Sequence, residues 1–168
     1  MTTGHIHFER EEDAAPVEML ASLYEARGWA YEYAGEDEII AEVQGSWASY
    51  QLRSVWREED HVLQVICLPD IRVPDDKRTQ MFEVLALINE QMWLGHFDIW
   101  SNGMVLLYRH ALMLGDDGLL SLEQAQTAIE AALDECDRFY PAFQFILWGD
   151  KSPAEALASA MVDAAGEA

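Results

Sequence analysis

The stretch NEQMWLGHFDIW, residues 89–100, decides how this chain folds. It places an amide, two carboxylates and an imidazole among bulky apolar side chains, as many active sites do. A base or ligand pair on one helix needs its members three or four residues apart, but Gly95 stands between Glu90 and His96. Glycine in this place is typical of the residue that ends a helix. The stretch therefore predicts a joint between a helix and a strand that begins at His96, and a pair formed by Glu90 and His96 is the alternative.

The residues before this joint predict a helix that buries a wide face. Asp75 and Asp76 favour a helix start, because acidic side chains are stabilised at the positive end of the helix dipole. Two adjacent stripes of mainly apolar side chains follow at helical spacing, and such a helix packs most simply against a sheet. The stripes consist of Met81, Leu85, Ile88 and Met92, and of Phe82, Ala86, Asn89 and Trp93.

The residues after the joint predict a hairpin and then two helices. Ser101-Asn102-Gly103 is a strong turn signal, because Asn-Gly adopts positive φ at low cost. The return strand is expected over residues 104–114. Ser121-Leu122-Glu123-Gln124 and Ser152-Pro153-Ala154-Glu155 are capping boxes, and each opens a helix. Pro141 is expected to end or kink the first of these helices.

The first half of the chain predicts one helix followed by short strands. Pro16 suits a first helical turn, and Gly28 ends the helix. Runs of alternating apolar residues follow, separated by turns. Strands segregated from helices in this way define an α+β fold, with an antiparallel β-sheet flanked by α-helices. We expect a flexible N-terminal arm over residues 1–13 and a single domain over residues 14–168. The strands are expected at residues 31–33, 39–43, 47–56 and 61–68.

Length and charge limit the kinds of partner that the chain can bind. The 168 residues, 51% of them hydrophobic, are enough for one domain with a substantial core. The formal charge of −21 argues against nucleic acid and anionic membranes, because both are bound by clustered Lys and Arg. The N-terminus does not resemble a signal peptide, and no stretch approaches the roughly 20 apolar residues of a membrane span. We therefore expect a cytoplasmic protein. Cys67 and Cys136 form no CxxC pair and are too few for a metal knuckle.

Three segments resemble the YbjN family, bacterial proteins described as sensory transduction regulators. The resemblance covers roughly residues 17–162. It implies a fold like that of type III secretion chaperones, which are often dimeric. It also implies a homodimer and a regulatory or protein-binding role, and it supplies no catalytic residue or cofactor. The segments are INEQMWLGHFDIW (residues 88–100), LLYRHALML (residues 106–114) and DRFYPAFQFILWGDKSPAEAL (residues 137–157).

Aromatic side chains are more numerous than one small core obviously needs. Aromatic residues are enriched at protein interfaces, so we interpret six of them as a candidate interaction surface for a partner protein or a second copy. Packing in the core is the alternative, because large aromatic residues dominate cores too. The six are Trp47, Tyr50, Trp56, Tyr140, Phe143 and Trp148.

Two groups of polar residues are candidates for a ligand site. His96, Asp98 and Arg109 are expected to line the mouth of a pocket, and a cross-strand ion pair between Asp98 and Arg109 is the alternative. In the N-terminal arm, His5-Ile6-His7 and Glu9 resemble a metal pincer, because alternate residues of an extended segment share a face. A polar terminal arm without a metal is the alternative there, and we predict no metal site.

No phosphate loop, Ser-His-Asp arrangement or HExxH helix is present, so we predict no catalytic residues and no cofactor. The first hypothesis is a non-enzymatic regulatory or chaperone-like protein that acts by binding another protein. The alternative is a small-molecule or metal-binding sensor that uses a pocket between the sheet and the helices.

Overall fold

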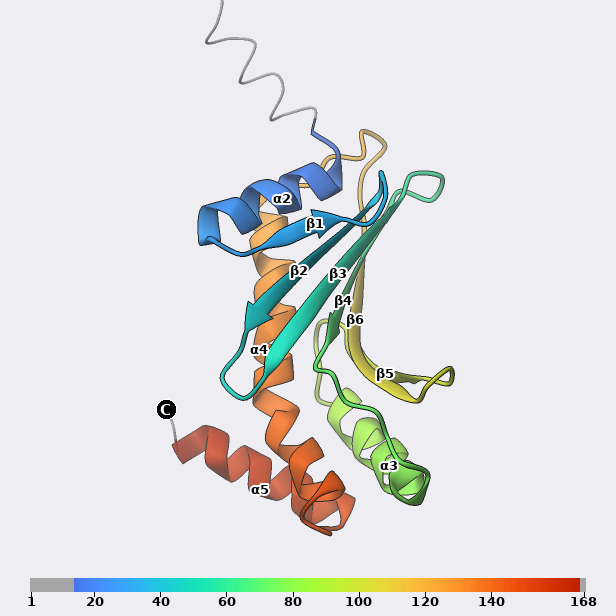
Figure 1. The fold of residues 1–168 in the computed structure, drawn as a ribbon, viewed down its shortest axis with the longest axis vertical. Helices are drawn as coiled ribbons and strands as arrows, with labels where there is room; N and C mark the ends of the chain where they lie inside the picture. Colours follow the sequence, from blue (N-terminus) through green and yellow to red (C-terminus); the bar gives the residue numbers. More distant parts are fainter. Residues whose placement is uncertain (1–13, 167–168) are drawn as a thin grey trace, which may run out of the picture.

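A computed structural model describes residues 14–166 of the chain. Within this range six strands form one antiparallel sheet in the order β1-β2-β3-β4-β6-β5, accompanied by four α-helices (Figure 1). The α+β class predicted from the sequence is confirmed. The elements are α2 (Pro16–Arg27), β1 (Tyr31–Tyr33), β2 (Glu38–Gln44), β3 (Ser49–Arg57), β4 (Val62–Leu68), the 3₁₀ turn η1 (Asp75–Lys77), α3 (Arg78–Asn89), β5 (His96–Trp100), β6 (Val105–Met113), α4 (Leu122–Leu147) and α5 (Pro153–Gly166).

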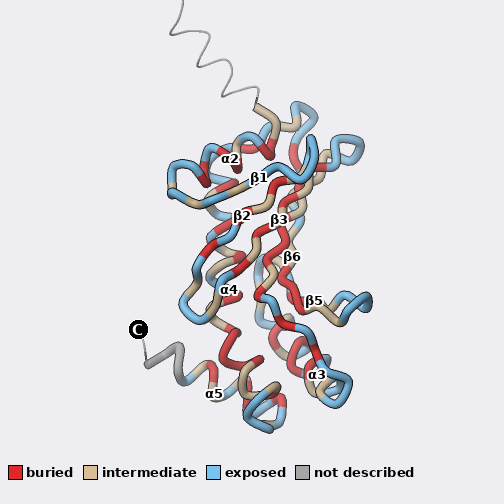
Figure 2. The backbone as a smooth tube through the Cα atoms, in the orientation of Figure 1, coloured by how far each residue is buried: buried red, intermediate tan, exposed pale blue. Residues whose placement is uncertain are grey.

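The sheet has one face covered by helices and one open face. α4 packs against β4 and β6, and α2 packs against β2, β3 and α4. Strand residues that point toward these helices are buried, whereas many of their neighbours along the strand are not (Figure 2). In β3 the buried side chains include Tyr50, Leu52 and Trp56, as the alternation in the sequence predicts. α3 and α5 close the lower end of the molecule, where α5 packs on α4 and α3 (Figure 1).

Helix α3 buries one stripe of side chains and not two. The helix ends at Asn89, so Met92 and Trp93 belong to the loop that follows. Phe82 is 46% exposed and Trp93 is 98% exposed. The prediction of two buried stripes is wrong, because α3 packs against β5, α4 and α5 through one side, and the second stripe points away from them. The buried residues of α3 are Met81, Val84, Leu85 and Ile88.

Side-chain hydrogen bonds hold the joint between α3 and β5 in place. Asn89 donates from Nδ2 to the Phe97 carbonyl oxygen at 3.0 Å, and its Oδ1 accepts the Phe97 N–H at 2.8 Å. Gly95 has a φ of 70°, and a Cβ at this position would collide with the hydroxyl group of Tyr108. That hydroxyl donates to the Leu94 carbonyl oxygen at 2.8 Å. The stretch is thus a structural joint, and both the backbone angle and the close approach of Tyr108 require glycine there.

The short-range signals for turns and helix starts are confirmed. The hairpin between β5 and β6 turns at residues 101–104, and Gly103 adopts a φ of 85°. The backbone N–H of Gln124 donates to Ser121 Oγ at 3.0 Å, and that of Glu155 donates to Ser152 Oγ at 3.3 Å. Both capping boxes therefore open the helices that the sequence predicts.

Helix α4 continues through Pro141 to Leu147. The helix therefore does not end at this proline, and that part of the prediction is wrong. A proline inside a helix removes a backbone hydrogen bond and costs roughly 3 kcal/mol. Burial offsets this cost, because Phe143 and Ile146 in the last turns of the helix are both buried in the core. A large apolar side chain contributes about 1.5–3 kcal/mol when it is fully buried. None of the helices described over residues 14–166 is long and apolar enough to cross a membrane.

Candidate functional site

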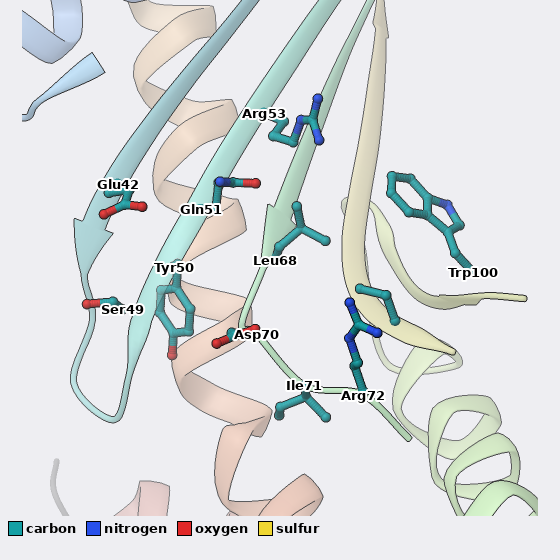
Figure 3. A pocket seen from close by; sticks show the side chains of 11 residues that line it. Glu42, Ser49, Tyr50, Gln51, Arg53, Leu68, Asp70, Ile71, Arg72 and Trp100 are labelled. Atoms are coloured by element: carbon teal, nitrogen blue, oxygen red, sulfur yellow. The ribbon is translucent and has the colours of Figure 1, made fainter. Parts of the chain in front are cut away.

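A hollow of about 550 Å³ lies on the open face of the sheet (Figure 3). Side chains from the neighbouring strands β2, β3 and β4 line one side of it, and the segment that leaves β4 lines the other. This segment runs alongside the start of β6, where Arg72 forms a bridge with Val105. The hollow therefore forms because segments that are far apart in the sequence lie side by side in the fold. Its lining residues are Glu42, Ser49, Tyr50, Gln51, Arg53, Leu68, Asp70, Ile71, Arg72, Trp100 and Val105.

Two buried apolar residues lie on the open face beside this hollow. Ile66 is 5% exposed and Leu107 is fully buried, yet both stand apart from the core cluster between the sheet and the helices. Ile66 lies between Arg53 and Arg109 in the register of β3, β4 and β6. The aliphatic stems of arginine side chains commonly cover apolar surface while their charged ends reach water. The open face thus combines an apolar floor with guanidinium groups around it.

The arginines of this face differ in how strongly they are already engaged. Arg53 donates to Glu38 Oε1 at 2.6 Å from Nη2 and at 3.2 Å from Nε. Arg72 is exposed and has no carboxylate within ion-pair distance in the part of the chain that the structure describes. It lines the same hollow as Trp100, which is 37% exposed. A guanidinium that shares a hollow with an aromatic ring is suited to bind a ligand with both a carboxylate and an apolar group.

The structure brings two of the three residues predicted to line a pocket mouth to one surface hollow. His96 and Arg109 line a hollow of about 320 Å³ on the open face, together with Gln64, Gly95, His110 and Ala111. Asp98 lies outside this lining but approaches Arg109 at 3.9 Å, which is the cross-strand pair considered as the alternative. Burial lowers the pKa of His110, and the nearby His96 adds to the effect. Arg109 contributes a guanidinium charge to this hollow.

The six aromatic residues predicted as an interaction surface divide into two groups. Trp47 is 45% exposed and Trp148 is 68% exposed, so both are accessible. The other four are buried, and the prediction that they form part of a surface is corrected. They lie on the covered face of the sheet or on the inner side of α4, where hydrophobic burial places large rings. These four are Tyr50, Trp56, Tyr140 and Phe143.

Tyr50 shows how a buried polar group is accommodated in this core. Its hydroxyl donates to Asp137 Oδ1 at 2.6 Å, and the same carboxylate accepts the Ser46 N–H at 3.0 Å. Burial, followed by the hydrogen bond to Asp137, raises the pKa of Tyr50. This bond ties the β2–β3 hairpin to α4, so it has a structural role.

The two cysteines lie in contact inside the core, with Cys67 on β4 and Cys136 on α4. Burial, and then the hydrogen bond to Cys67, raises the pKa of Cys136. A thiol in this state is a poor nucleophile. The interpretation of Cys67 as a buried strand thiol is confirmed.

The alternative function, a small-molecule or metal-binding sensor, requires a metal site or a pocket between the sheet and the helices. Over residues 14–166, no group of three or more His, Cys, Asp or Glu side chains is arranged to hold a metal ion. The candidate ligands His5, His7 and Glu9, like the whole arm over residues 1–13, lie outside the described residues. The space between the sheet and the helices is occupied by the hydrophobic core, whereas the 550 Å³ hollow lies on the opposite face.

Sequence reasoning missed Arg72 and Trp100. The alternation that places Arg53 on the outer face of β3 was visible, but Arg72 lies in an irregular segment between two prolines. Its position against Val105 depends on a long-range bridge, for which the local sequence contains no signal.

The fold and the open face define a class of small α+β proteins in which helices cover one side of an antiparallel sheet. The profile of the YbjN family, described as "Putative bacterial sensory transduction regulator", matches residues 16–145, and the chain belongs to this family. No match was found among curated proteins. The chain is similar in fold to the protein in "Crystal structure of YbjN, a putative transcription regulator from E. coli", with a TM-score of 0.52 and 10% sequence identity. The match covers 72% of this chain and 85% of that one.

Proposed function

We propose that this chain is a non-enzymatic regulatory protein that binds a partner protein through the open face of its sheet. The observation that carries the proposal is the hollow lined by both Trp100 and Arg72, an exposed arginine with no carboxylate within ion-pair distance over residues 14–166. The family description, which is that of a regulator, agrees with this role.

The chemistry of the hollow indicates the kind of segment that fits. A carboxylate of the partner would bind the guanidinium of Arg72, and an apolar side chain would lie against Leu68, Val105 and Trp100. The chain carries a net charge of −21, so most of its surface repels an acidic segment. Glu42 and Asp70 also line the hollow and Arg53 is paired with Glu38, so the attraction would be confined to the guanidinium of Arg72. This contrast would provide specificity for where the carboxylate binds.

The test compares two charge reversals on the same face of the sheet. Arg72→Glu removes the unpaired cation from the hollow, whereas Arg57→Glu changes an exposed arginine at the far end of β3. Affinity purification from the native host, with quantitative mass spectrometry, should recover the same partner with the wild-type chain and with Arg57→Glu. Recovery should fall about tenfold or more with Arg72→Glu, as expected for the loss of a charge-assisted bond of roughly 1.5–3 kcal/mol. Equal recovery with both variants would refute the proposal.

A small organic anion is the second candidate for the same hollow. A volume of about 550 Å³ lies within the range of roughly 300–1,000 Å³ that is usual for small-molecule sites. A thermal-shift screen with carboxylated and phosphorylated metabolites tests this candidate. A shift that Arg72→Glu abolishes, without any recovered protein partner, would favour the small-molecule sensor.

The homodimer expected from the family resemblance remains a prediction. Light scattering at micromolar concentration should give twice the chain mass of 19.1 kDa. The monomer mass would contradict this prediction without affecting the proposed role of the open face.

A further inference from the structure

The upper part of β6 is an open edge of the sheet. β5 pairs with β6 only as far as His96, which lies opposite Arg109. Beyond this pair β6 continues without β5 beside it (Figure 1). On its other side β6 bonds through its even-numbered residues, as shown by the bond from the N–H of Leu114 to the His61 carbonyl oxygen at 2.8 Å. The N–H and C=O groups of Ala111 and Met113 therefore point away from β4.

These groups have no hydrogen-bond partner over residues 14–166, and no strand lies beside them there. Ala111 is exposed, and Met113 is 84% exposed. A free edge of this kind accepts a further strand.

β5 forms the lower part of this edge of the sheet, and side chains bind its outward-pointing backbone groups. The N–H and C=O groups of Phe97 are both bonded to Asn89. The next outward N–H, that of Ile99, donates to Asp98 Oδ1 at 2.8 Å. Natural proteins block exposed edges in this way to prevent unwanted pairing. The fold thus protects β5 and leaves the donors of Ala111 and Met113 available.

The surroundings of the open edge favour an acidic strand. The 320 Å³ hollow beside it is lined by Arg109, His96 and Gln64, and none of its lining residues is acidic. The ion pair between Arg109 Nη1 and Asp98 spans 3.9 Å, and the Gln64 amide oxygen accepts from Arg109 Nε at 3.3 Å and Nη2 at 2.8 Å. The guanidinium has five N–H donors, so it retains donors for a second carboxylate.

The described chain begins at the same end of the sheet as this edge, on the β4 side of β6. Ala14 lies in a small hollow together with His61 and Gly118, and the carbonyl oxygen of His61 is bonded to the residue that follows Met113. The 13 residues before Ala14 can span up to about 43 Å when extended. The edge from Ala111 to Met113 is only about 7 Å long.

We propose that residues 5–9 of this chain, His-Ile-His-Phe-Glu, bind as an additional strand along Ala111–Met113. Ile6 and Phe8 alternate with His5, His7 and Glu9, so a strand would present apolar groups on one face and polar groups on the other. The polar face would place Glu9 within reach of Arg109. This tethered strand would complete the edge without a partner molecule, and the proposal is independent of the function of the 550 Å³ hollow.

Amide hydrogen exchange measured by NMR on the full chain tests the proposal. In the wild-type protein the N–H groups of Ala111 and Met113 should be protected. In the double variant Ile6→Pro, Phe8→Pro, whose prolines have no donor, both should exchange at least about tenfold faster. Thr2→Pro, outside the proposed strand, is the matched control and should leave both rates unchanged.

The amide of Phe97, bonded to Asn89, reports that each variant is folded and should stay protected throughout. Fast exchange of Ala111 and Met113 in the wild-type chain would overturn the proposal. So would protection that persists in the double variant. If that protection increased with protein concentration, the strand would come from a second copy.

Discussion

On the covered face of the sheet, Phe97 packs against three aromatic rings. On the open face, Arg53 of β3 forms an ion pair with Glu38 of the neighbouring strand β2. The same strands supply both faces, because successive side chains point to opposite sides. The covered face is held by burial and tolerates few changes. The open face combines charged groups with a thin apolar floor, so its residues are free to serve recognition. Substitutions on the two faces should therefore separate stability from binding.

Phe97→Ala should have the largest effect on stability. The ring of Phe97 is 2% exposed and packs edge-to-face on Tyr108, Phe139 and Phe143 at centroid distances of 5.2–6.0 Å. Loss of a buried phenylalanine side chain costs about 3–5 kcal/mol. Urea denaturation followed by tryptophan fluorescence measures the change. An effect below about 1 kcal/mol would mean that this end of the sheet is not firmly packed.

Tyr50→Phe should have the next largest effect, because it removes a polar contact from the covered face and keeps the ring. The hydroxyl bonded to Asp137 at 2.6 Å is lost, and a hydrogen bond to a charged group contributes about 1.5–3 kcal/mol. The free energy of unfolding should fall by that amount. Tyr33→Phe is the control, because Tyr33 is 50% exposed and its substitution should leave stability unchanged.

Glu38→Gln tests the open face, where the expected loss of stability is below about 1 kcal/mol. Glu38 pairs with Arg53 at 2.6 Å, but both side chains are partly exposed, and exposed ion pairs contribute little. The same urea titration measures it. A loss as large as that of Tyr50→Phe would show that the open face is as important for stability as the covered face.

Much of the difference between the covered face and the open face could be predicted from the sequence. Alternation in β3 separates Tyr50 and Leu52 from Gln51 and Arg53, and this pattern needs only the two-residue period of a strand. Turns and helix starts were also predictable, because capping boxes and Asn-Gly are local signals.

Features that depend on tertiary packing could not be predicted in the same way. Trp93 and Tyr50 both sit in amphipathic patterns, yet one is 98% exposed and the other fully buried. Gly95 indicated the helix end, but α3 ends earlier, at Asn89, whose side chain is hydrogen-bonded to the backbone of Phe97. The hollow around Arg72 depends on which strand lies beside β6, and the local sequence does not encode that neighbour.

The smallest effect is expected from Glu135, on the helix that covers the sheet. Its Oε2 is buried and has no hydrogen-bond partner among residues 14–166, and Arg138 approaches it only to 3.9 Å. Burial is the main cause that raises the pKa of Glu135, and Asp134 adds to it while Arg138 opposes it. A carboxyl group whose pKa is raised in the folded state binds its proton more tightly there than in the unfolded chain. Its contribution to stability is therefore full below its ordinary pKa and is lost as pH rises through the folded value.

Glu135→Gln should accordingly stabilise the protein at pH 7 by a few tenths of a kcal/mol, since the partly exposed charge is screened by solvent. The gain should disappear near pH 4, where the native carboxyl group is protonated. Thermal unfolding of both proteins from pH 4 to pH 7 measures the difference, and Glu36→Gln in the exposed turn between β1 and β2 is the control. A gain that is the same at both pH values would show that it comes from the amide itself and not from removal of the charge.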